Sequence, residues 1–94
     1  MTLDEQIHNG SRAKEVLDNE QFKAAFDAIE QELTESWKQS PQRDAEGREK
    51  IHQYITLLAK VKTHLVATLE TGKLAQLEVR HKQTLIERAR EWVG

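Results

Sequence analysis

Residues 44–71 read DAEGREKIHQYITLLAKVKTHLVATLET, and this stretch decides the fold. Its apolar side chains recur in alternating steps of three and four residues, which is the spacing of a coiled-coil seam. The seam consists of Ile51, Tyr54, Leu58, Val61, Leu65 and Thr68. Additional apolar residues beside the seam widen it, so we expect burial against more than one neighbour. The pattern predicts a helix over residues 44–71, about 42 Å long at the usual helical rise, with Asp44 as its N-cap.

The segment before this helix predicts a second one, over residues 20–39. One face of it is apolar, with side chains spaced by three or four residues, namely Phe22, Phe26, Ile29, Leu33 and Trp37. Asn19 has the chemistry of an N-cap, and Pro41 ends the helical pattern because proline cannot continue a helix. We therefore expect an antiparallel hairpin of residues 20–39 and 44–71, in which the apolar face of the first helix meets the seam of the second.

The flanking segments are also predicted to be helical. Leu3, Ile7, Val16 and Leu17 suggest short N-terminal helical turns, interrupted at Asn9 and Gly10, a pair that favours a turn. Gly72 is either a C-cap or a defect of about 1 kcal/mol inside a continuing helix. A C-terminal amphipathic helix follows, with one stripe at Leu74, Leu77, Leu85, Ala89 and Trp92 and a neighbouring seven-residue repeat at Val79, Ile86 and Val93. No segment alternates with period two, so a sheet is not expected.

Composition indicates a single small helical domain over residues 1–94, in an all-α fold. The chain has 37% hydrophobic residues and no cysteine, which excludes disulfides and thiolate chemistry. It has no apolar run of about 20 residues and no N-terminal signal segment, so we expect neither a membrane partner nor export. Residues 1–40 hold nine acids against four bases and residues 72–94 hold three against five, which gives an acidic front and a mildly basic back.

Catalytic and metal-binding patterns are missing from the sequence. The histidines lie at no known ligand spacing, at His8, His52, His64 and His81. Carboxylate pairs such as Glu46 with Glu49, or Asp27 with Glu30, occur on any charged helix, and nothing around them predicts the desolvation that general acid–base work requires. No phosphate-binding loop, nucleophile elbow or calcium loop is present. We therefore expect no enzymatic activity, no cofactor and no metal.

Two sets of side chains in the last third of the chain are candidate sites. The first is a protein interface that contacts either the hairpin or another subunit, formed by Leu77, Leu85, Ile86 and Trp92. The second is a set of possible phosphate contacts at Lys73, Arg80, Lys82, Arg88 and Arg90. A helix spreads these cations over several faces, and glutamates lie among them, so nucleic-acid binding is possible but not favoured.

Three stretches carry a resemblance to a known group of proteins. They are FKAAFDAIE (residues 22–30) continuing to Trp37, SPQRDAEGREK (residues 40–50) and LETGKLA (residues 69–75). Over roughly residues 12–76 the chain resembles short, mostly uncharacterised proteins encoded near the virion-assembly genes of tailed bacteriophages. The tract from Ser40 to Arg48 is the most specific part of the resemblance, which supplies context but no catalytic residues.

The function predicted from these observations is non-enzymatic protein–protein interaction in a tailed phage, as an assembly factor or minor virion component. We expect a homo-oligomer that contacts a phage structural protein or a host protein, in the host cytoplasm or the virion. Two alternatives stay open. One is a small DNA-binding protein of phage packaging or regulation, and the other is an inhibitor that docks on a host protein through its acidic first helix.

Overall fold

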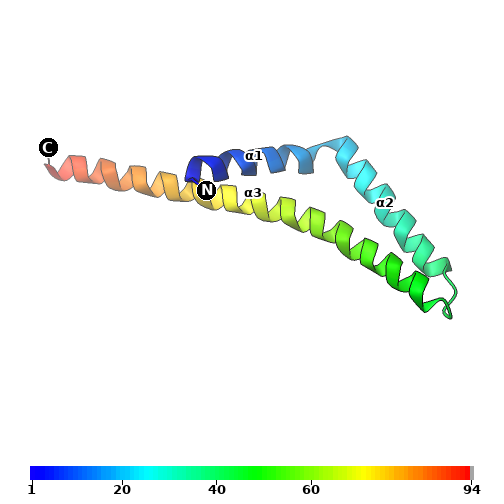
Figure 1. Ribbon diagram of the computed structural model, residues 1–94. Coiled ribbons are helices and arrows are strands. Elements are labelled where there is room, and N and C mark those ends of the chain that lie inside the picture. The colour runs from blue at the N-terminus through cyan, green and yellow to red at the C-terminus, as the bar shows by residue number, and fades with distance from the viewer. Residues whose placement is uncertain (94) are drawn as a thin grey trace.

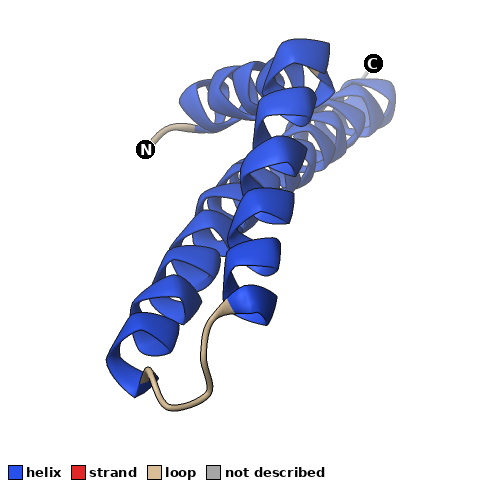
Figure 2. Cartoon of the chain, turned by 90° about the vertical axis from the view of Figure 1, so that its right-hand side faces the viewer, coloured by secondary structure: helices blue, strands red, loops and turns tan. Residues whose placement is uncertain are grey.

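The computed structural model describes residues 1–93, and the backbone alone at Val93. It contains three helices, α1 (Leu3–Asp18), α2 (Glu20–Gln39) and α3 (Ala45–Val93), and no strand within the described residues. Helix α1 runs antiparallel along the middle of α3, and α2 continues in the same general direction from the end of α1 to the start of α3, which then runs back beneath both (Figure 1). A view along the molecule shows the short loop that connects α2 to α3 (Figure 2), and Asn19 alone separates α1 from α2. The predicted all-α fold is confirmed.

Local side-chain hydrogen bonds fix where each helix begins. The Thr2 Oγ1 accepts from the Glu5 amide at 3.1 Å, the Asn19 Oδ1 from the Phe22 amide at 2.9 Å, and the Asp44 Oδ1 from the Gly47 amide at 3.0 Å. Each bond satisfies an amide of the first helical turn that has no carbonyl partner within the helix. The N-caps predicted at Asn19 and Asp44 are confirmed.

The N-terminal segment differs from the expected short turns. It is one continuous helix of 16 residues, and Asn9 and Gly10 lie inside it instead of interrupting it. The reason is tertiary, because Gly10 is buried where α1 crosses α3 at Gly72. A preference for a turn is a weak local effect, and packing against another helix overrides it.

Helix α3 continues through Gly72, which is therefore an interior residue and not a C-cap. The helix has 49 residues, so it is about 73 Å long. It gives the described chain an extended form with dimensions of 77 × 25 × 17 Å and a radius of gyration of 21.3 Å. A compact domain of this length has a radius of gyration of about 12 Å.

Small side chains allow α1 and α3 to approach closely. A β-carbon added to Gly72 would lie 2.8 Å from the Gly10 Cα and 3.0 Å from the Gln6 carbonyl oxygen. Ala13 and Ala75 are 5% and 3% exposed one helical turn further along their respective helices. The two backbones are therefore nearly in contact, and this crossing contains most of the buried core.

The expected hairpin is present, but its interface is looser than predicted. Helix α3 packs more extensively with α1 than with α2. Of the apolar face of α2, Phe26 is buried at 8% exposure, while Ile29 and Trp37 are 46% and 41% exposed. On the facing seam, Tyr54 is 56% exposed. The difference arises because α2 diverges from α3, which leaves a hollow between them, while α1 packs beside the part of the seam at Leu65 and Thr68.

Arg48 holds the turn between α2 and α3. Its Nη1 donates to the carbonyl oxygens of Trp37 at 3.2 Å and Ser40 at 3.0 Å, and to the Ser40 Oγ at 2.8 Å. The guanidinium lies 4.4 Å from the centre of the Trp37 ring, in cation–π geometry. One side chain from the first turn of α3 therefore caps the last carbonyls of α2.

The close crossing at Gly72 predicts whether Gly72→Ala stabilises or destabilises the fold. By helix propensity alone, Gly72→Ala would stabilise α3 by about 0.5–1 kcal/mol. Because the new methyl group meets the α1 backbone, we expect instead a net loss of about 1–2 kcal/mol in the free energy of unfolding, measured by urea denaturation followed by circular dichroism. Ser11→Ala, an exposed position beside Gly10, is the control. An unchanged or increased stability of Gly72→Ala would contradict the close crossing.

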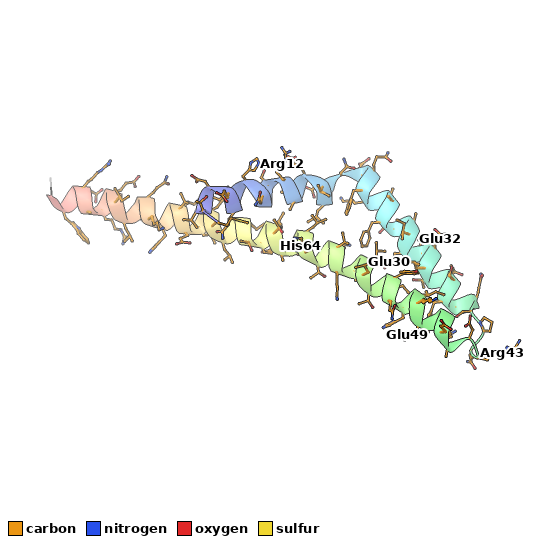
Figure 3. All side chains as sticks on the ribbon, in the orientation of Figure 1. Arg12, Glu30, Glu32, Arg43, Glu49 and His64 are labelled. Carbon is orange, nitrogen blue, oxygen red and sulfur yellow. The ribbon has the colours of Figure 1, made fainter. Side chains whose placement is uncertain are left out.

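The Arg48 contacts give a second prediction. Arg48→Lys keeps the positive charge, but an ammonium group cannot reproduce the planar fork of donors stacked on an indole ring. We expect a loss of about 1–2 kcal/mol in the free energy of unfolding, measured in the same way. Arg43→Lys is the matched control, since Arg43 projects outward from the turn (Figure 3). Equal stabilities of the two variants would show that Arg48 does not hold the turn.

Candidate protein-interaction surface on helix α3

The last part of α3 lies outside the packed region of the described chain. Every residue from Arg80 to Trp92 is exposed, and we call residues 80–92 the α3 extension. Figure 1 shows it continuing past the beginning of α1, with no other described helix beside it. An isolated helix of this length is marginal in water. Its stability therefore depends on continuity with the rest of α3 and on what packs against it.

Two different faces of α3 carry apolar residues. The face packed on α1 and α2 follows a seven-residue repeat, at Ile51, Leu58, Leu65, Gly72 and Val79. The second face consists of four exposed side chains, which we call the outer stripe, with Leu74 at 67%, Leu77 at 58%, Leu85 at 49% and Trp92 at 83% exposure. At about 100° per residue, the outer stripe lies about 140° around the helix from Gly72, Ala75 and Val79.

The four predicted interface residues divide between these faces. Leu77, Leu85 and Trp92 belong to the outer stripe, and Leu74 joins them. Ile86 follows Val79 by seven residues, so it continues the α1-facing line beyond the point where α1 begins, and it is 53% exposed. None of the four contacts the hairpin in a way that buries it. The predicted contact of this set with the hairpin is therefore not seen within the described residues.

A second apolar surface lies between α2 and α3. It is a hollow of about 500 Å³ lined by Phe26 and, from α3, by Ile55, Leu58, Ala59 and Val66. Glu30 and Lys62 flank it, and the Lys62 ammonium lies 5.3 Å from the centre of the Phe26 ring. Glu30 lies on the side of α2 that faces α3, whereas Glu32 lies on the outer side (Figure 3). The hollow exists because α2 diverges from α3.

The five possible phosphate contacts do not form one cationic surface. Lys73 pairs with Glu70 at 3.6 Å and Lys82 with Glu78 at 3.5 Å, so carboxylates partly neutralise two of them. Lys73, Arg80 and Arg88 lie within about 80° of one another around the helix, whereas Lys82 and Arg90 lie on other sides. Three glutamates share the face of the first three cations, namely Glu70, Glu87 and Glu91. A surface for a phosphate backbone needs several cations gathered on one face, and here carboxylates are mixed among them.

Titratable groups show no concentrated site. The four histidines and the carboxylates of Asp27, Glu30, Glu46 and Glu49 are all exposed. Within the described residues, no three histidine, aspartate or glutamate side chains lie where they could hold a metal ion. A hydrogen bond and charge attraction from Lys14 lower the pKa of Asp18. These two residues form a solvent-exposed pair one turn apart on α1. No helix within residues 1–93 is both long enough and apolar enough to cross a membrane.

Comparisons with known proteins give no match. No family model matches the chain, and neither a curated protein nor a solved structure resembles it closely enough to be identified as similar. The geometry of the chain is therefore the basis for its proposed function.

The sequence did not predict that Arg48 holds the turn or that Gly10 and Gly72 form a close helix crossing. A signal for the glycines is present, because Gly10 with Ala13 and Gly72 with Ala75 place small residues one helical turn apart in both helices. Such spacing lets two helix backbones approach closely. Arg48 has no comparable signal, because its three acceptors become neighbours only when the turn forms.

The mixing of cations with glutamates on α3 predicts weak binding to DNA. We expect no detectable binding of a duplex to the chain at low ionic strength, where release of counterions most favours association. Fluorescence anisotropy of a labelled duplex, titrated with the protein, measures this. Saturable binding that weakens steeply with added salt, and that is reduced in Arg80→Gln and Arg88→Gln, would restore a nucleic-acid role.

Proposed function

We propose that this chain is a non-enzymatic helical protein–protein interaction protein of a tailed phage, acting as an assembly factor or minor virion component. The observation that carries the proposal is the α3 extension with its outer stripe. Three leucines and a tryptophan, each about half exposed or more, lie along one face of a single helix. Contiguous exposed apolar residues of this kind mark sites of protein contact.

The surface area of the chain supports the same proposal. The described chain exposes 7757 Å², whereas a compact monomer of 10.9 kDa exposes about 5,600 Å². The surplus of about 2,200 Å² exceeds the roughly 800 Å² that each partner contributes to a standard interface. The chain therefore has ample surface for a partner without unfolding any of its helices.

The extended form suits a part that bridges larger components. An uninterrupted helix of 49 residues separates the turn at Pro41 from Trp92 by most of the 77 Å length of the molecule. Particles of tailed phages are assembled from many copies of small parts, so a contact of modest area is repeated many times by symmetry. The resemblance of residues 12–76 to phage proteins agrees with this role, and we infer self-association as part of it.

Mass spectrometry of purified virions and of assembly intermediates tests the proposal, in a phage that encodes the chain. We expect the protein in one or both fractions. Leu85→Glu places a charge in the outer stripe and should lower its amount there about tenfold or more, since a buried unpaired charge is strongly unfavourable. Gln83→Glu adds the same charge on the opposite side of α3 and should leave the amount unchanged.

Two results would contradict the proposal. The first is absence of the wild-type chain from both fractions together with stoichiometric recovery of a host protein, which would identify a host-directed inhibitor. The second is equal incorporation of Leu85→Glu and the wild-type chain, which would show that the outer stripe is not the contact surface.

A further inference from the structure

We propose that the outer stripe pairs with the outer stripe of a second copy of this chain, antiparallel, with the twofold axis near residue 83. This inference rests on the proposed function, because it names the partner of the same surface. The pairing makes the α3 extension of each copy the cover for the exposed leucines of the other.

The two ends of the outer stripe are symmetric about residue 83, and Leu77 falls level with Ala89 of the second copy. Leu74 and Trp92 are each nine residues from residue 83, so antiparallel pairing places Leu74 of one copy level with Trp92 of the second copy. Leu85 then lies level with His81, which shares its face of the helix. The residues of the α3 extension, 80–92, cover residues 74–86 of the second copy, including Leu74 and Leu77. Trp92, the largest side chain of the stripe, therefore covers Leu74, its most exposed leucine at 67% exposure.

Charge order distinguishes this pairing from a parallel one. Arg88 lies on the same face of α3 as the outer stripe, so a parallel pair in register would place it beside Arg88 of the second copy, and two like charges held close together repel. In the antiparallel pair, Glu78 is level with Arg88 of the second copy. The other three cations of residues 74–92 are Arg80, Lys82 and Arg90, and they are level with uncharged residues, Ile86, Thr84 and Gln76. The charge sequence of the helix therefore favours the antiparallel arrangement.

The structure leaves room for the second copy. Helix α1 occupies the face of α3 at Gly72 and Ala75, about 140° around the helix from the outer stripe. A second α3 on the outer stripe therefore lies on the far side of α3 from α1. The two packed regions, each made of α1, α2 and the first part of α3, then lie at opposite ends of a longer particle. The surplus surface of each chain is more than one such interface requires.

The absence of cysteine in the chain makes a cross-linking test direct. Thr84 is exposed, lies at the edge of the outer stripe and is one residue from the proposed axis. In the antiparallel pair the two Thr84 positions are offset by only about 3 Å along the helix axes, whereas the two Glu91 positions are about 24 Å apart. We expect a short bis-maleimide to cross-link Thr84→Cys into a covalent dimer and to leave Glu91→Cys monomeric.

A matched pair of substitutions completes the test. Sedimentation equilibrium should give a dimer for the wild-type chain, and Leu85→Glu should raise the dissociation constant about tenfold or more. Gln83→Glu should change it less than about twofold, and circular dichroism should show that both variants keep their helical content. Cross-linking of Glu91→Cys as efficiently as Thr84→Cys would establish a parallel pair and overturn the proposal.

A monomeric mass at high micromolar concentration, with no cross-linking of Thr84→Cys, would also overturn the pairing. That result is distinguishable from failure of the proposed function. If Leu85→Glu still prevented incorporation into phage particles while the chain was monomeric, the outer stripe would bind a different phage protein and only the second copy would be excluded as its partner.

Discussion

The contact between Gly10 and Gly72 determines how the rest of the chain is arranged. Two helix backbones can approach this closely only where neither carries a side chain, and alanines at positions 13 and 75 extend the narrow region by one turn. This crossing holds α1 against the middle of α3 and fixes the position of α1 along the length of α3. It also fixes the position of Asn19, from which α2 runs on to the Pro41 turn (Figure 1). Helix α2 therefore meets α3 closely only near that turn, and Phe26 fills part of the space between them.

The sequence was sufficient to predict α2 and the first part of α3, because helix formation depends on near neighbours. The apolar spacing of Phe22 to Trp37 and the capping chemistry of Asn19 and Asp44 act within a few residues, and the structure agrees with them. Gly10 and Gly72 could not be interpreted in the same way. A glycine serves equally in a turn, a C-cap or a close crossing. Which of these applies here depends on a partner helix distant in the chain.

The candidate surface was also predictable in part, since its spacing could be interpreted from the sequence but its exposure could not. Its residue spacing predicted that Leu77, Leu85 and Trp92 lie on one face, and helix geometry alone was enough for this. The sequence could not show which apolar face of α3 is covered within the chain, because α1 was expected to be broken at Asn9 and Gly10. Once α1 is a whole helix, the line through Gly72 and Val79 is occupied and the outer stripe is left exposed.

Continuity of α3 through Gly72 has a mechanical consequence. Because no loop separates the α1-packed region from the α3 extension, the rotational phase of the outer stripe is locked to the glycine crossing. Each residue inserted into or deleted from this part of the helix would turn the stripe by about 100° and shift it by about 1.5 Å. Changes of seven or eleven residues turn the stripe by only about 20°, whereas a single residue moves it to a different side of the helix. The length of this helix is therefore constrained to changes close to a whole number of helical turns.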